Sequence, residues 1–195
     1  MEKKIFELFA NYNKKVNNSM NEIIKTLTNE QWKKQFSGFY KSIQDICSHI
    51  YFWDYNELNR CKYLRKFNSL EEKFPYEEKL EFYSIKITEE GIEYLDKDFT
   101  SSRQIFLNSS INEYVNMRTD LDNRIIKFFD EIESNDLENT IKFTTITGNK
   151  FKWRIGDLML TLFNHQTHHR GMISLYLDML EIENDFSNLI FYCEQ

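Results

Sequence analysis

The chain has 195 residues, enough for one domain with a sizeable core, and 41% of them are apolar, which excludes a disordered chain. The formal net charge is −6 and the sequence contains no basic block, so we expect no nucleic-acid partner. Five glycines and one proline are few helix breakers, and they favour long helices over a β-fold with many turns.

The cysteines and the termini indicate a cytoplasmic protein. Three cysteines, Cys47, Cys61 and Cys193, are widely spaced and form no CxxC pair, as expected of reduced thiols. The N-terminal stretch mixes charges with apolar residues and is therefore not a signal peptide, and no stretch is long enough for a transmembrane helix. We expect one domain over residues 1–195, without a membrane partner.

Apolar residues at helical spacing predict two helices in the first third of the chain. The stripe of the first consists of Ile5, Leu8, Phe9, Tyr12, Val16, Met20, Ile23 and Leu27. The second starts near "SGFYKSI" and continues to Leu64, and its stripe consists of Phe39, Ile43, Ile46, Ile50 and Trp53. His49 lies beside this second stripe.

A long connection of residues 67–100 follows, with the one proline, Pro75, and many charges. It contains candidate short strand or helix pieces such as "LEFYSIKIT". A long connection between bundle helices usually indicates a crossover, which lets two neighbouring helices run parallel.

A third helix and a β-hairpin are predicted next. The helical stripe consists of Leu107, Ile111, Tyr114, Leu121, Ile125, Phe128 and Ile132, and "TSSRQ" offers residues for the N-cap. Arg118 takes one stripe position, where it either reaches solvent or pairs with a carboxylate. The segment "NTIKFTTITGNKFKWR" is rich in β-branched and aromatic residues with Gly-Asn at the turn, which predicts the hairpin.

A fourth helix is predicted from Ile155 to Leu180. Its stripe consists of Ile155, Leu158, Leu162, His165, His169, Ile173, Tyr176 and Leu180, and the apolar tail "ENDFSNLIFYCEQ" is expected to dock back on the body. Four long helices with one hairpin predict an all-α fold, a four-helix bundle with a long connection between its second and third helices.

Two histidines occupy successive core positions of the fourth helix. His165 and His169 are one turn apart, so their imidazoles converge and can offer two ligands to a transition metal. His49 can supply the third ligand from the second helix, while His168 points sideways or outward. Three histidines would leave positions open for water or substrate, as catalytic sites do. The alternative is that these histidines are neutral packing residues.

Other residues near these positions have ordinary interpretations. Trp53, Tyr55 and Trp153 are more consistent with packing than with a substrate cradle. Asp45 and Asp54 could orient an imidazole, but their positions are more typical of carboxylates on a helix surface.

Several segments together are similar to the DinB/YfiT-like family. "LFNHQTHHRGMISLYLDMLEI" resembles the family's last-helix motif H-x-x-x-H-R-G-Q. "KSIQDICSHIYFWDYNEL" resembles its second-helix segment, in which a single histidine precedes an aromatic-rich stretch. The hairpin and the tail are also similar, so the resemblance covers nearly the whole chain. Met172 stands where Gln is usual, a departure that concerns the substrate more than the metal.

The resemblance implies an up-down-down-up four-helix bundle, often a homodimer, that binds a divalent metal, usually nickel or zinc. By position, it implies His49, His165 and His169 as the metal ligands, with His168 as a non-ligand. Relatives include bacillithiol transferases and mycothiol-dependent isomerases, so a low-molecular-weight thiol is an implied substrate. The family name refers to induction by DNA damage and does not imply action on DNA.

Three hypotheses follow from these observations. The first is a metal-dependent enzyme that transfers a low-molecular-weight thiol to an electrophile, or hydrolyses its substrate with activated water. The second is a non-enzymatic metal-binding stress-response protein. The third is a DNA-damage protein that contacts nucleic acid, which the acidic charge disfavours. Three imidazoles suit zinc, nickel, copper or iron, so the sequence does not name the metal.

Overall fold

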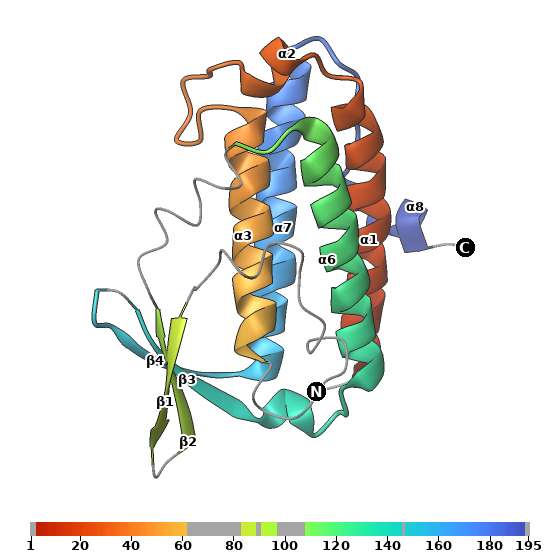
Figure 1. The fold of residues 1–195 in the computed structure, drawn as a ribbon. Coiled ribbons are helices and arrows are strands. Elements are labelled where there is room, and N and C mark those ends of the chain that lie inside the picture. The colour runs from red at the N-terminus through yellow and green to blue at the C-terminus, as the bar shows by residue number, and fades with distance from the viewer. Residues whose placement is uncertain (1–2, 62–82, 89–90, 97–107, 146, 194–195) are drawn as a thin grey trace.

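Four long helices form a bundle with a small β-sheet beside one of its ends (Figure 1). A computed structural model describes residues 3–61, 83–88, 91–96, 108–145 and 147–193. The long helices are α1 (Lys3–Lys25), α3 (Ile43–Arg60), α6 (Ile111–Glu131) and α7 (Ile155–Asp178). The mainly helical fold predicted from the sequence is thus confirmed. Within the described ranges, no helix combines the length and the apolarity that crossing a membrane requires.

Within the bundle, α1 lies against α6 and α3 lies against α7 (Figure 1). The amide of Gln44, in the first turn of α3, donates to the carbonyl of Ser109 just before α6. Farther along both helices, the Arg118 guanidinium donates to the Asp54 carboxylate. The two helices on either side of the long connection therefore run in the same direction, as a crossover requires.

The helix starts carry local caps that explain where α3 and α6 begin. The Ser42 hydroxyl accepts from the backbone N–H of Asp45 at the start of α3. Ser110 and Glu113 form a reciprocal capping box at the start of α6. Ser110 is thus the N-cap of α6, whereas "TSSRQ", which the sequence offered for the N-cap of the third helix, lies outside the described residues. Leu64, the expected end of the second helix, and Leu107, the first residue of the third stripe, lie outside the described residues.

The predicted start of the second helix is also too early. Phe39 precedes α3 and is 83% exposed, so it is not a member of the buried stripe. The segment between α1 and α3 instead holds a short helix, α2 (Asn29–Lys33), whose Trp32 is buried. The capping box of Thr28 and Gln31 starts α2, a local signal that the apolar spacing did not reveal.

The predicted stripe of the first helix is confirmed from Tyr12 onward, where Tyr12, Val16, Met20 and Leu27 are buried, and is wrong in the first turns of α1. Ile5 and Leu8 are exposed, whereas Phe6, Asn13 and Asn17 are buried. The two asparagines face a polar region in the bundle interior, where they form hydrogen bonds. Apolar spacing did not reveal these two positions, because part of the interior of this bundle is polar.

The β-sheet is larger than the single predicted hairpin. Strands β3 (Thr140–Thr144) and β4 (Lys150–Arg154) form that hairpin, and Gly148 adopts a φ of 83° at its turn. Strands β1 (Tyr83–Thr88) and β2 (Gly91–Asp96) form a second hairpin, and β2 pairs with β3 in parallel. The strand piece proposed in "LEFYSIKIT" is confirmed from Tyr83 onward. Apart from β1 and β2, the 67–100 connection lies outside the described residues.

The C-terminal tail docks on the bundle as predicted. Phe186 is buried in the core, and the Tyr12 hydroxyl donates to its carbonyl at 3.4 Å. The short helix α8 (Leu189–Cys193) follows, next to α1 (Figure 1). A single 3-10 turn (Asp136–Glu138) links α6 to β3. Cys47 and Cys61 are buried free thiols, as predicted, and the side chain of Cys193 lies outside the described residues.

Candidate metal centre

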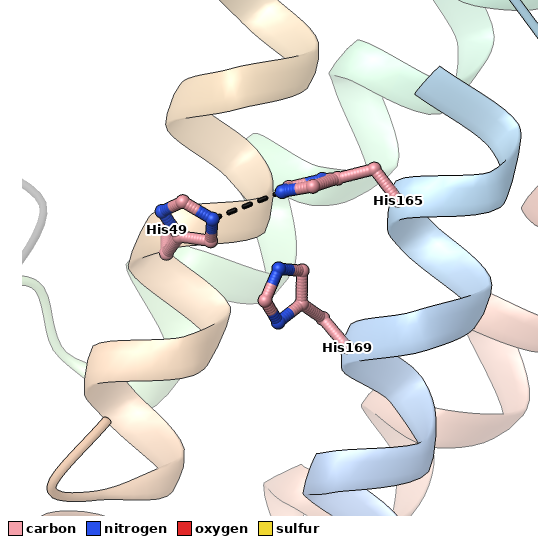
Figure 2. A group of neighbouring side chains, drawn as sticks. All are labelled: His49, His165 and His169. Carbon is pink, nitrogen blue, oxygen red and sulfur yellow. Dashed lines mark hydrogen bonds between the residues drawn. The ribbon is translucent and has the colours of Figure 1, made fainter. Parts of the chain in front are cut away.

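The structure brings His49, His165 and His169 together between two helices of the bundle. His49 projects from α3, and the other two project from α7 toward it (Figure 2). One ring nitrogen from each histidine lies within 4.8 Å of the others. These are the three residues that the sequence singled out.

The apolar residues of α7 explain why its two histidines face inward. Leu158 and Leu162 precede His165 on the same stripe, Ile173 follows His169, and all three apolar side chains are fully buried. Their burial shows which side of α7 faces the interior. His169 is 5% exposed, and His165 is partly buried.

His168 lies where the helical spacing predicted. Its side chain is exposed, and its ring contacts that of His169 at a centroid distance of 4.8 Å. It does not belong to the cluster of converging imidazole nitrogens.

The separation of the His49 and His165 ring nitrogens fits a shared metal ion. The Nε2 atoms of His49 and His165 lie 2.9 Å apart (Figure 2). Zinc–imidazole bonds are roughly 2.0–2.1 Å long, so two nitrogens at this separation would subtend an angle of about 90° at a shared ion. Such an angle is that of neighbouring ligands in octahedral coordination, and it leaves room for the third imidazole and for further ligands.

Burial keeps the imidazoles neutral and able to bind a metal. Burial, assisted by the neighbouring His169 and His49, lowers the pKa of His165 to about 3. Burial and the neighbouring His168 lower the pKa of His169 to about 4. Both rings therefore carry a free lone pair at neutral pH without first losing a proton.

Among the described residues, no hydrogen bond to the second ring nitrogen orients either α7 imidazole. Metal-binding histidines usually donate that N–H to a carboxylate, a carbonyl or water. Here the Nδ1 atoms of His165 and His169 are buried and find no hydrogen-bond partner in the structure as described. Packing and the placement of the helices must orient these rings instead.

Two aromatic side chains form walls around the imidazoles. The indole of Trp53 stacks on His165 at 5.0 Å, so this tryptophan packs directly against a candidate ligand. The ring of Tyr40 lies 4.8 Å from His49 and 5.2 Å from His169. Sequence reasoning missed Tyr40 because it precedes α3, where helical spacing gives no guidance. The Tyr176 hydroxyl donates to the Tyr40 carbonyl at 2.7 Å and holds it in place.

The other aromatic candidates are packing residues, as predicted. Tyr55 is buried and stacks with Tyr51 at 6.2 Å. Trp153 lies on β4 and packs edge to face against Phe143 in the sheet.

The two candidate carboxylates differ from each other in position. Asp45 accepts from the backbone N–H of Lys41 at the start of α3, in keeping with an ordinary helix-terminal carboxylate. Asp54 is fully buried and accepts from Arg118 at 2.6 Å, so its prediction as a surface carboxylate is wrong. Nearly every side chain in the C-terminal half of α3 is buried, and this burial was not evident from apolar spacing.

Arg118 pairs with two carboxylates and does not reach solvent. It is fully buried and also donates to Asp122 at 2.6 Å. Burial lowers its pKa, but the charges of Asp122 and Asp54 outweigh this effect and raise the pKa above its usual value. These residues belong to a larger buried group that we call the polar core: Asn13, Asn17, Asp54, Arg118, Asp122, Gln166 and Arg170.

Comparison with known proteins yields one finding. A family model described as the DinB family matches residues 1–181. Among curated proteins, none matches the sequence.

Proposed function

The chain belongs to the DinB family, and on this premise we propose that it is an enzyme dependent on a divalent transition metal. The observation that carries the proposal is the convergence of His49, His165 and His169. They would hold the ion through neutral imidazole nitrogens, and nickel or zinc is the ion that the family resemblance implies. The helix directions described above also support the up-down-down-up connection of that family.

The proposed reaction is the transfer of a low-molecular-weight thiol to an electrophilic small molecule. A divalent ion with open positions lowers the pKa of a thiol or water molecule that binds to it. The three histidines contribute no negative charge, so they would leave the full positive charge of the ion available for this effect. The rings of Tyr40 and Trp53 would shield the site from water on two sides.

The buried thiols of the chain support a thiol that comes from outside. Burial raises the pKa of Cys47 to about 12, and it also raises the pKa of Cys61 well above its usual value. Both thiols are fully buried and are thus unsuited to act as nucleophiles at neutral pH.

Two alternatives use the same site. A metal-dependent hydrolase would activate water in place of a thiol, but the ligating cluster found among the described residues offers no carboxylate as a general base. A non-enzymatic metal-binding stress-response protein would hold the ion without turnover. Whichever of these functions holds, we propose that the protein is a cytoplasmic homodimer, by analogy with the family. We also propose that it has no nucleic-acid partner, in keeping with its net charge of −6.

The first experiment is elemental analysis of protein purified without a tag or chelator. We expect about one metal ion per chain in the wild type, and loss of that ion in His49→Ala and His169→Ala. His168→Ala is the matched control, since it removes an exposed imidazole next to His169 and should retain the metal. Absence of metal from the wild type, even when nickel or zinc is offered, would refute the proposal.

Turnover then separates the enzyme from the alternatives. Consumption of a thiol in the presence of a model electrophile should require metal in the wild type and in His168→Ala, and it should be lost in His169→Ala. Hydrolysis of an ester without thiol consumption would favour the hydrolase. Bound metal without either reaction would favour the non-enzymatic protein.

A further inference from the structure

A continuous series of buried hydrogen bonds joins all four long helices. Arg118 of α6 donates to Asp54 of α3 and to Asp122 of α6, at 2.6 Å each. The amide of Asn17, from α1, donates to both carboxylate oxygens of Asp122 and to Oε1 of Gln166 on α7, at 3.1 Å each. The two helices that bear the histidines, α3 and α7, are thereby connected through α6 and α1.

A second set of contacts fixes α7 to α1 one turn farther along. The Arg170 guanidinium donates to Oδ1 of Asn13 at 2.5 Å and to Oε1 of Gln166 at 3.2 Å. It also donates to Oγ1 of Thr167 and lies over the ring of Tyr12 at 5.3 Å. Arg170 is 2% exposed, so these bonds are shielded from water.

The polar core residues of α7 directly follow its two histidines in sequence. Gln166 comes after His165, and Arg170 comes after His169. Successive residues of a helix are rotated by about 100°, so binding Gln166 and Arg170 to α1 turns the two imidazoles toward α3. On α3, the bond of Asp54 to Arg118 constrains the helix that carries His49.

We propose that the polar core positions the metal ligands, with Gln166, Arg170 and Asp54 as positioning residues that fix the rotation and register of α7 and α3. The inference rests on the proposed metal site. Since the Nδ1 atoms of the α7 histidines find no partner within the described ranges, the rings depend on the placement of their helices.

A small rotation of a helix moves its side chains by a distance comparable with the length of a metal–nitrogen bond. The tip of a side chain lies about 5–6 Å from the helix axis, so a rotation of about 20° displaces it by about 2 Å. That displacement equals a whole metal–nitrogen bond, which is roughly 2 Å. Apolar packing resists such a shift but is not directional, whereas buried hydrogen bonds of 2.5 to 3.1 Å constrain both the distance and the angle between the groups that they join.

Gln166→Met is the first test variant. Methionine is close to glutamine in length, and it removes the Oε1 acceptor shared by Asn17 and Arg170 without touching an imidazole ligand. Cobalt(II) added to the metal-free protein serves as the probe. Its visible absorption reports the coordination geometry, and its displacement by a chelator reports the affinity. We expect an altered spectrum and at least a tenfold loss of cobalt affinity.

Asn13→Leu is an independent second variant. Asn13 lies on α1, which carries no proposed ligand, and its loss removes the shortest contact of Arg170. We expect an altered cobalt spectrum here too, with a loss of cobalt affinity of about threefold or more. This variant keeps the inference testable if Gln166→Met does not fold.

Leu158→Ala is the matched control for a purely structural effect. Leu158 is a fully buried apolar residue of α7 outside the polar core. Its truncation should lower the stability of the metal-free protein, while the cobalt spectrum stays unchanged and the affinity stays within about twofold. Denaturant unfolding of each metal-free variant provides the comparison.

The outcomes separate this inference from the proposed function. A wild type that takes up no cobalt overturns the metal site and this inference with it. A wild type that binds cobalt, with unchanged spectra and affinities in Gln166→Met and Asn13→Leu, overturns only the positioning role. An affinity that simply follows stability across all variants, Leu158→Ala included, also overturns it.

Discussion

Metal binding by this protein should release few protons, even in mildly acidic solution. An imidazole with an ordinary pKa near 6.5 binds a metal about tenfold more weakly at pH 5.5 than at pH 7.5, since most of it is protonated at the lower pH. Two such imidazoles would cost about a hundredfold in affinity. With pKa values of about 3 and about 4, His165 and His169 are each protonated to about 3% or less at pH 5.5. They should therefore contribute almost nothing to the loss.

Calorimetric titration of zinc at pH 5.5, in two buffers with different ionisation enthalpies, counts the released protons directly. We expect at most one proton per ion, since His165 and His169 have almost none to release. His168→Ala is the control, and it should give the same count because its imidazole is exposed and outside the cluster. Release of two or three protons would show that the α7 imidazoles are solvated, and would refute the account of their burial.

Three further predictions concern stability and the walls of the site. The pKa values of His165 and His169 are lower in the folded chain than the unfolded value near 6.5. Below that pH the unfolded chain binds protons at these residues and the folded chain does not, so the free energy of unfolding is highest above about pH 6.5. The free energy of unfolding, measured with denaturant on the metal-free protein, should fall as the pH drops from about 6.5 toward 4. The variant with both His165→Ala and His169→Ala should lack this fall. Arg118→Met should cost about 3–5 kcal/mol, because it leaves two buried carboxylates without their cation, whereas Arg124→Met should cost about 1 kcal/mol or less in the same assay. In Gly38→Ala, the new Cβ would collide with the Tyr176 hydroxyl that holds Tyr40, so zinc affinity measured by competition should fall about threefold or more; an unchanged affinity would show that this wall is dispensable.

The parts of the site that the sequence predicted are those that follow from a single helix. His165 and His169 take positions on a stripe whose other members are apolar, so their inward direction follows from helical geometry alone. His49 needed an additional step, because helical spacing says that it lies near a core face but not that this face meets α7. The structure supplies the pairing of α3 with α7.

The parts that were missed depend on contacts between distant segments. Tyr40 lies outside any helix, and only the tertiary fold brings it against His49. Asp54, Asn13 and Asn17 look like surface residues by composition, yet their partners lie on other helices and make burial tolerable. The parallel pairing of β2 with β3 likewise joins strands separated by a whole helix.

The two faces of α7 that point into the bundle differ in the charges that they carry. The face of α7 that meets α3 carries neutral imidazoles beside aromatic rings, a surrounding that contributes no compensating negative charge to the cluster described here. The face that meets α1 carries Gln166 and Arg170, which bond to Asn17 and Asn13. Within the polar core, the charges of two arginines, Arg118 and Arg170, balance those of two carboxylates, Asp54 and Asp122. The positive charge of an ion held by the imidazoles would therefore not be compensated by its protein ligands. It would attract an exogenous ligand, and it would attract an anion such as a thiolate most strongly. Because the charged groups of the polar core lie on the opposite face of α7, they can hold the helices together without neutralising the charge of a metal ion at the imidazoles.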